Sequence, residues 1–254
     1  MDALLKWAIA NINTEKEDAP PRPEGWVPPK PLDPEIIDYI LGKPVSLQIQ
    51  ECMDVVEDLK STLENKEIAL ENLEMFVENI DNAANLAPLG LWPRILGQLK
   101  SPEPTIRAGA AWVCGTAVQH NPKAQKAFEY YRGLEPILEI LKDDPDPEVR
   151  TKALLCVSGY TRNNIAGFKE FVQMKGLDIL KICVVPAASS SLKVKALFLL
   201  HALLDEINDE ALSEDQRVPP EFEQGVVNMG FIDDAIALLR SPSDIDINIA
   251  EKAL

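Results

Sequence analysis

The sequence is poor in the residues from which catalytic and metal sites are usually built. Only two histidines occur in 254 residues, and the four cysteines form no Cys-x-x-Cys pair. No Gly-x-Ser-x-Gly, His-Glu-x-x-His, Gly-x-Gly-x-x-Gly or complete phosphate-loop motif is present. We therefore expect no enzyme, no cofactor and no metal site. His120 is expected in a turn and His201 in helix packing. The cysteines (Cys52, Cys114, Cys156, Cys183) are expected to be reduced and buried.

Long apolar runs and excess positive charge are also missing. No stretch of about 18 apolar residues occurs, so we expect no membrane span. The N-terminus carries Asp2 and lacks the basic and apolar regions of a signal peptide, which predicts a cytosolic protein. The net charge of −16 argues against nucleic acid and anionic membranes as partners, because both are bound through clustered Lys and Arg. A local basic patch is still allowed.

What is present is an internal repeat between residues 104 and 191. Arg107, Ala110, Gly133 and Leu134 recur 43 residues later as Arg150, Ala153, Gly176 and Leu177, and the first two positions return as Lys193 and Ala196. Helix-length apolar segments at this period indicate an armadillo or HEAT array, whose units bury their apolar faces only by stacking. We predict an all-α, right-handed solenoid that binds partners on its surface.

The chain before the repeats divides in two. Residues 1–12 place Leu4, Leu5 and Ile9 on one helical stripe bordered by Trp7. Such a helix either caps the first repeat or folds on contact with a partner, and a membrane anchor is disfavoured by the acidic residues that follow. Residues 13–44 are rich in proline, which predicts an extended linker.

Residues 45–254 are expected to form about four repeats. In the first, Ser46 is the predicted N-cap of a helix whose inward residues are Ile49, Met53 and Val56. A second helix is expected at 66–79, a loop at 81–90 and a short helix at 91–99. The next two units each begin with a long helix opened by proline, Pro104 or Pro147, followed by two shorter helices. The fourth carries an acidic insert near 205–221, and the last 14 residues are either a cap or the start of a further repeat.

Polar residues recur at the ends of the long helices. Stacking of the repeats would align them in a row along one edge of the concave face. They are Asn79, Asp81, Asn82, Gln119, His120, Asn121, Arg162, Asn163 and Asn164. Two compatible interpretations follow: they cap helix C-termini, or they hold a bound partner.

Several segments carry a resemblance to a known family. LLKWAIAN, ENLEMFVENIDNAANL, GTAVQHNPKAQ, GLEPILEIL and VRTKAL, with residues 193–200, resemble the fungal armadillo-type nucleotide exchange factors of the DnaK-class (seventy-kilodalton) heat-shock chaperone, which include animal relatives. The resemblance implies a cytosolic, monomeric co-chaperone. It would grip one lobe of the chaperone's ATPase domain, open the nucleotide cleft and promote release of ADP and client. The mobile N-terminal segment would help to clear the client.

The resemblance also implies partner-binding residues. Position by position they are Asn79, Asp81, Asn82, Ala83, Gln119, Asn121, Arg162, Asn163 and Lys195. The client-release residues would be Leu4, Leu5, Trp7 and Ile9. Ala83→Arg is expected to block binding sterically and to leave the helical fold intact. The alternative is an adaptor that holds an extended peptide. We consider it weaker, because Trp112 is the only Trp in the long helices and the equivalent positions are expected not to be aromatic.

Overall fold

The computed structural model describes residues 42–185, 188–206 and 220–240, and in this part of the chain all regular structure is helical. The chain divides into two units, Met1–Pro44 and Val45–Leu254, and the described helices lie in the second. The helices are α3 (Val45–Glu57), α4 (Leu63–Val77), α5 (Ile80–Asn85), α6 (Trp92–Gln98), α7 (Pro104–Val118), α8 (Pro122–Tyr130), α9 (Leu134–Asp143), α10 (Pro147–Thr161), α11 (Ile165–Gln173), α12 (Gly176–Val184), α13 (Ser190–Asp205), α14 (Pro220–Asn228) and α15 (Phe231–Arg240).

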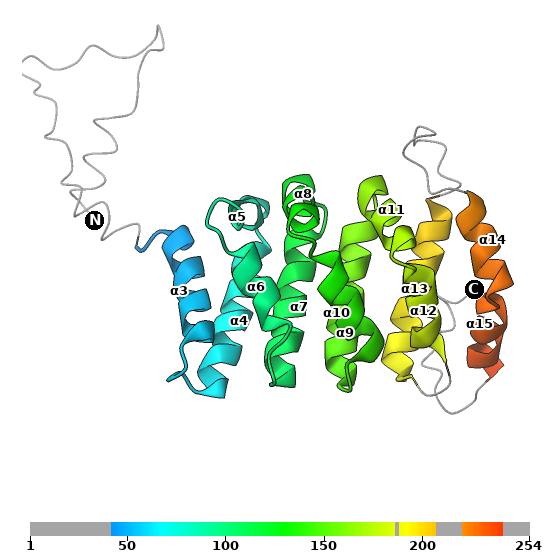
Figure 1. Cartoon of the computed structure of the whole chain (residues 1–254), viewed down its shortest axis with the longest axis horizontal. Helices are drawn as coiled ribbons and strands as arrows, with labels where there is room; N and C mark the ends of the chain where they lie inside the picture. Colours follow the sequence, from blue (N-terminus) through cyan, green and yellow to red (C-terminus); the bar gives the residue numbers. More distant parts are fainter. Residues whose placement is uncertain (1–41, 186–187, 207–219, 241–254) are drawn as a thin grey trace, which may run out of the picture. The chain divides into compact units, whose positions relative to one another are not determined.

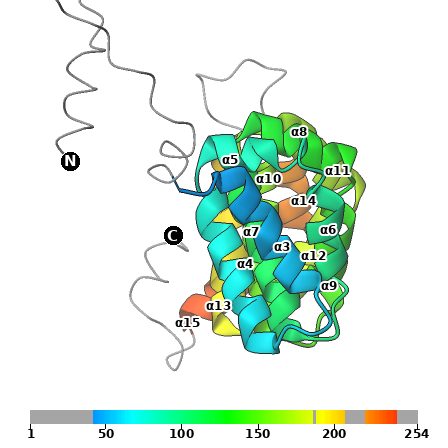
Figure 2. The same ribbon diagram turned by 90° about the vertical axis from the view of Figure 1, so that its left-hand side faces the viewer.

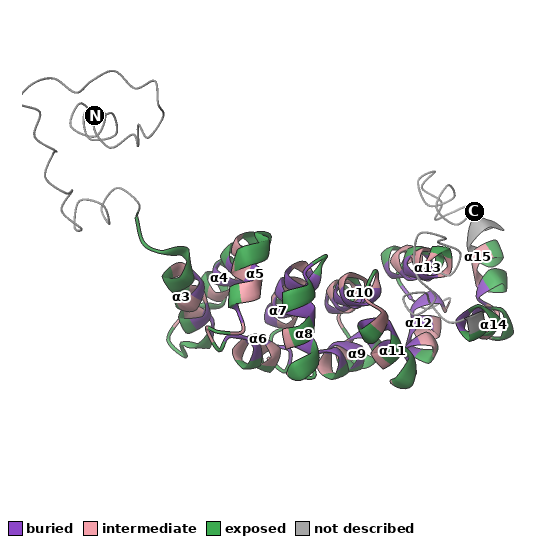
Figure 3. Cartoon of the chain, turned by 90° about the horizontal axis from the view of Figure 1, so that it is seen from above, coloured by how far each residue is buried: buried purple, intermediate pink, exposed green. Residues whose placement is uncertain are grey.

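Two short helices and one long helix form the repeating unit of the array. Three such triplets follow one another, α5–α6–α7, α8–α9–α10 and α11–α12–α13, flanked by α3–α4 and by α14–α15 (Figure 1). The long helices α4, α7, α10 and α13 pack successively against one another and line one face, which we call the long-helix face (Figure 3). Figure 2 shows the array from its α3 end, with α3 packed on α4.

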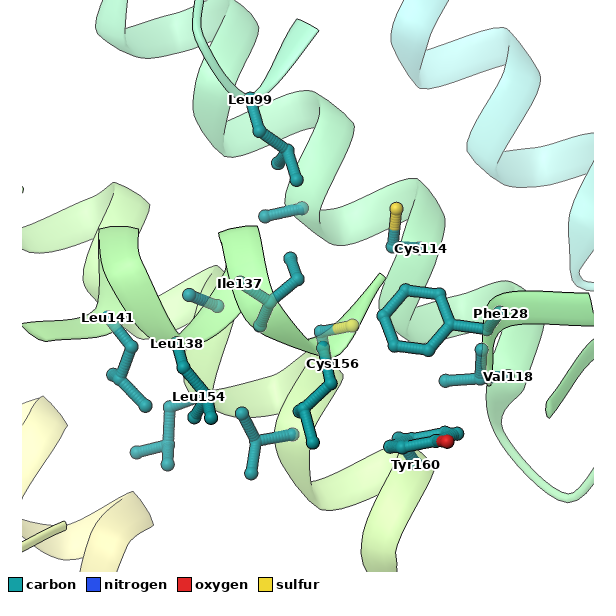
Figure 4. Close-up of a cluster of buried hydrophobic side chains, with 14 of the residues drawn as sticks. Leu99, Cys114, Val118, Phe128, Ile137, Leu138, Leu141, Leu154, Cys156 and Tyr160 are labelled. Atoms are coloured by element: carbon teal, nitrogen blue, oxygen red, sulfur yellow. The ribbon is translucent and has the colours of Figure 1, made fainter. Parts of the chain in front are cut away.

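A row of aromatic side chains joins neighbouring repeats through the core. Phe128 of α8 contacts Trp92 of α6 and Tyr160 of α10 edge to face, with ring centroids 5.5 and 4.9 Å apart. All three are fully buried, and Phe128 and Tyr160 lie beside Cys114 and Cys156 in Figure 4. Burial raises the pKa of the Cys114 thiol to about 12, so this cysteine stays protonated at neutral pH. Cys183 is also buried, whereas Cys52 is half-buried.

The repeated glycines make room for buried phenylalanine rings. A Cβ on Gly133 would lie 2.3 Å from the ring of Phe128, and one on Gly176 would lie 2.1 Å from the ring of Phe171. Each glycine follows the residue that ends the previous turn in a left-handed conformation, Arg132 or Lys175. Each repeat places an aromatic ring over the start of its second helix, and this explains why the glycine recurs after 43 residues.

The repeated arginines tie the long helices α7 and α10 to the segments that precede them. Arg150 donates from Nε to the carbonyl of Leu141, and Arg107 donates from Nη1 to the carbonyls of Ser101 and Pro102. Arg107 also forms a two-pronged ion pair with Asp144, at 2.7 and 2.9 Å, that is largely buried. Arg150 thus satisfies a carbonyl in the last turn of α9, and Arg107 satisfies two carbonyls of the turn before α7 and joins two repeats through Asp144.

The Arg107–Asp144 pair predicts an acid-sensitive contribution to stability. Burial alone would raise the pKa of Asp144, but hydrogen bonds from Arg107 and from the Asp146 amide hold it below its ordinary value. Because the pKa of Asp144 is lower in the folded state, its carboxylate stabilises the fold above the unfolded-state pKa of about 3.9. This contribution to stability is lost as the pH falls through the folded-state pKa. We expect Asp144→Asn to cost about 2–3 kcal/mol at pH 7 and to flatten the pH dependence of unfolding below about pH 4. Urea titrations at a series of pH values measure the free energy of unfolding, and the same pH dependence for wild type and variant would contradict this.

Several sequence expectations need correction. The predicted loop at 81–90 contains helix α5, because the Asn79 side chain caps its first turn. Ser46 lies inside α3 and is not its N-cap, although Ile49, Met53 and Val56 are buried as predicted. His201 is half exposed and pairs with Asp205 at 3.2 Å, so it is not a packing residue. Residues 1–12, most of the predicted linker, most of the acidic insert and the last 14 residues lie outside the described residues.

Candidate functional site

The long-helix face carries a groove made of three adjoining hollows. The first lies over α4, α7 and α10, the second over α7, α10 and α13, and the third over α10 and α13. Trp112 lines both the first and the second, and Arg162 and Phe198 line both the second and the third. The middle hollow has a volume of about 260 Å³. Because the hollows share walls, we treat them as one site, the groove.

Two glycines in the middle hollow allow α7 and α10 to approach closely. A Cβ on Gly115 would lie 3.1 Å from the backbone of Cys156, and one on Gly159 would lie 3.0 Å from the carbonyl oxygen of Gly115. Next to them Thr116 donates a 2.6 Å hydrogen bond to the buried carboxylate of Glu74 on α4. Small residues and internally satisfied polar groups thus give the groove a backbone-lined floor.

Large apolar side chains stand along the groove at the repeat period. Trp112, Leu155 and Phe198 are 43 residues apart and come from α7, α10 and α13. Leu155 is 40% exposed and Phe198 is 42% exposed. Exposed large apolar groups at the centre of a hollow are typical anchors for a protein partner.

Cations lie against these anchors. The Lys152 ammonium sits 3.2 Å from the centroid of the Trp112 ring, and the Arg162 guanidinium lies 5.8 Å from that of Phe198. Burial lowers the pKa of Lys152, and the positive charge of Lys195 lowers it further, whereas Glu148 and Glu74 oppose the shift. Arg162 Nε is buried and has no hydrogen-bond acceptor within the part of the chain described. The cations are therefore held in place by the walls of the groove.

The structure brings together only some of the predicted partner-binding residues. Gln119, Arg162 and Lys195 meet in the middle hollow, and Asn163 lines the third. Asn79, Asp81 and Asn82 lie at the start of α5 and line none of the three hollows. Ala83 is only 1% exposed and belongs to the core, so Ala83→Arg would disturb packing and is wrong as a purely steric test of the surface.

The recurring asparagines begin helices. The side chains of Asn79, Asn121 and Asn164 accept hydrogen bonds from backbone amides in the first turns of α5, α8 and α11. Asn121 is 2% exposed and also donates to the carbonyl of Ile80 at 2.9 Å. The C-capping interpretation is therefore wrong for these asparagines, whose recurrence follows from N-capping. Gln119 and Arg162 do occupy the C-cap positions of α7 and α10.

Sequence reasoning missed Lys152, Leu155 and Phe198. The 43-residue period could have identified them, because Lys152 lies one repeat before Lys195 and Leu155 lies one repeat before Phe198. Phe198 also corrects the expectation that no position equivalent to Trp112 is aromatic.

Within the described helices, none is long and apolar enough to cross a membrane. The same part of the chain holds no group of three or more His, Cys, Asp or Glu side chains arranged to bind a metal ion.

Solved structures with a similar backbone include armadillo-repeat proteins. Computationally designed armadillo repeat proteins for modular peptide recognition match 83% of this chain and 79% of their own, with a TM-score of 0.61 at 15% identity. The armadillo repeats only protein of Plasmodium falciparum matches 87% of this chain and 95% of its own, with a TM-score of 0.59 at 14% identity. The predicted all-α armadillo-like solenoid is thereby confirmed.

Sequence comparisons identify the family. Residues 1–86 match the model "Nucleotide exchange factor Fes1", and residues 82–226 match the "SIL1/FES1/HPBP1 C-terminal domain". The protein named Hsp70 nucleotide exchange factor fes1 of Schizosaccharomyces pombe is 40% identical over 69% of this chain, and FES1 of Mycosarcoma maydis is 35% identical over 79%. The chain spans only 61% and 54% of those two relatives. FES1 of Candida glabrata is 34% identical over 91% of this chain and 79% of its own length. The chain belongs to the SIL1/FES1/HPBP1 family.

Proposed function

We propose that the chain is a nucleotide exchange factor of the cytosolic Hsp70 (DnaK-class) chaperone and that the groove grips the chaperone's ATPase domain. The observation that carries the proposal is the row of half-buried Trp112 and exposed Leu155 and Phe198 on the long-helix face of a protein whose relatives are named Hsp70 exchange factors. Large apolar side chains flanked by cations favour a protein surface as the ligand. The chain itself supplies binding energy and performs no covalent chemistry.

Exchange then follows from differential binding. A factor that binds the open, nucleotide-free ATPase domain more tightly than the closed, ADP-bound form shifts the population toward the open form. Linkage requires ADP to weaken the factor's hold by the same ratio. The long helices α4, α7, α10 and α13 pack on one another, so we expect the groove that they line to keep its shape and to fit one form of the ATPase domain better than the other.

The remaining parts of the chain fit this role as further proposals. Asn79, Asp81 and Asn82 would extend the contact beyond the groove at the α5 end. Residues 1–12, with Leu4, Leu5, Trp7 and Ile9, would help to release the client. Residues 13–44 would serve as the linker that connects them to the repeats. We propose a cytoplasmic monomer without a nucleic-acid or membrane partner.

The test is release of a fluorescent ADP analogue from the chaperone, followed by stopped flow with increasing amounts of the full chain. The proposal predicts an acceleration that saturates with concentration. Binding of the ATPase domain without acceleration would make the chain an adaptor, and the absence of both would refute the proposal.

A second candidate is an adaptor for an extended peptide. The aromatic residues Trp112 and Phe198 at equivalent positions favour it, because stacked armadillo helices can hold a peptide between such side chains. If this protein accelerates the release of ADP from the isolated ATPase domain in a saturable manner, the result would argue against the adaptor, because an adaptor that only holds an extended peptide does not open a folded domain.

A further inference from the structure

The groove is sharply divided in charge, although the whole chain carries a net charge of −16. The middle hollow is lined by Arg162 and Lys195 and by no carboxylate among the described residues. The first hollow is lined by three carboxylates, those of Glu67, Glu71 and Glu148, and by one cation, Lys152. We call these the cationic centre and the acidic shoulder of the groove.

The two cations that line the cationic centre, Arg162 and Lys195, form no ion pair within the part of the chain that the structure describes. In addition, Arg162 Nε is buried without an acceptor among the described residues. Lys152 packs on the Trp112 ring, and the carboxylates of Glu148 and Glu74 compensate its charge in part. A buried donor without an acceptor costs free energy that a bound partner can recover. The centre therefore favours a ligand that brings its own negative charge.

The carboxylates beyond the centre are already engaged. Glu206 accepts two hydrogen bonds of 3.2 Å from the Asn163 amide, and Asp205 pairs with His201. Both carboxylates line the third hollow together with Arg162, and Lys195 does not line that hollow. By contrast, no hydrogen bond or ion pair involving Glu71 is found within the described residues, and its side chain is exposed.

We propose that the partner surface presents carboxylates to the cationic centre and basic side chains to the acidic shoulder, and that this charge order fixes its orientation along the groove. The inference rests on the proposed function and adds the chemistry of the recognised surface. Complementary charge gives register and orientation, because the reversed alignment would set like charges against each other. The apolar side chains of Trp112, Leu155 and Phe198 would contribute affinity in either alignment of the partner. The charges are therefore needed to select one alignment along the groove.

The test uses charge reversals at both ends with matched controls elsewhere. Lys195→Glu reverses the centre, and Glu71→Lys reverses the shoulder. Lys142→Glu and Glu139→Lys make the same charge changes on α9, where both side chains are exposed and line none of the three hollows. For each full-length variant, the affinity for the ATPase domain and the acceleration of ADP release are measured at low and high salt.

We expect both groove variants to weaken binding by about tenfold or more at low salt, with the loss shrinking at high salt. The α9 controls should stay within about twofold of wild type. If Glu71→Lys tightens binding while Lys195→Glu weakens it, the partner is uniformly acidic and the proposed charge order is wrong. If both reversals behave like their controls while wild type still accelerates release, the charge order fails and the proposed function stands. If wild type accelerates nothing, the proposed function fails and the inference falls with it.

Discussion

Phe198→Ala is expected to weaken binding of the Hsp70 ATPase domain by about 30-fold or more, the loss typical of an aromatic anchor at the centre of an interface. Phe198 is 42% exposed, lines both the middle and the third hollows and holds the Arg162 guanidinium over its ring. Truncation removes the apolar contact and leaves Arg162 less well positioned. Because the ring is only half covered in the free protein, the free energy of unfolding should fall by less than about 1 kcal/mol.

The matched control is Ile232→Ala on α15. Ile232 is another exposed apolar residue and lines none of the three groove hollows. Its truncation should leave affinity and exchange unchanged. Equal affinity of Phe198→Ala and wild type, with both folded by circular dichroism, would remove the groove from the interface.

Phe128→Ala is expected to lower the free energy of unfolding by about 3–5 kcal/mol. Phe128 is fully buried, contacts Trp92 and Tyr160, and fills the space that Gly133 leaves open. Truncation is expected to leave a cavity between α6, α8 and α10, where the ring now contacts Trp92 and Tyr160. Since each repeat is stabilised mainly by its neighbours, the loss should reduce the cooperativity of unfolding as well.

Urea titration followed by circular dichroism measures this loss. Tyr130→Ala on the same helix is the control, because Tyr130 is 79% exposed and its truncation should cost less than about 1 kcal/mol. A change below 1 kcal/mol for Phe128→Ala would contradict the assigned core.

The architecture could be predicted from the sequence because residues that pack between repeats recur at a fixed spacing. Pro104 and Pro147 open α7 and α10 as expected, and Gly133 and Gly176 recur because each lies against a buried ring. Helix α5 was missed because six residues are too few to show an apolar period. Its start depends on one hydrogen-bonded cap, at Asn79.

The site was harder to predict than the fold. Asn121 was predicted to bind a partner because polar residues recur at the ends of the long helices. In the structure it recurs because it is a buried helix cap. A sequence period alone does not distinguish a capping residue from a binding residue. Phe198 and Leu155 were overlooked because apolar residues in a long helix are expected to face the core. Only the packing of α10 against α13 shows that these two face the groove.

The most direct test of the account is the coupling between this protein and ADP on the chaperone's ATPase domain. Calorimetric titration of the domain with the full chain, with and without saturating ADP, gives two dissociation constants. The account predicts at least about tenfold weaker binding with ADP, and the same factor for ADP binding in the presence of the protein. It also predicts that Phe198→Ala weakens binding in both states. Equal affinity with and without ADP would contradict it, because a ligand that binds both states equally shifts neither.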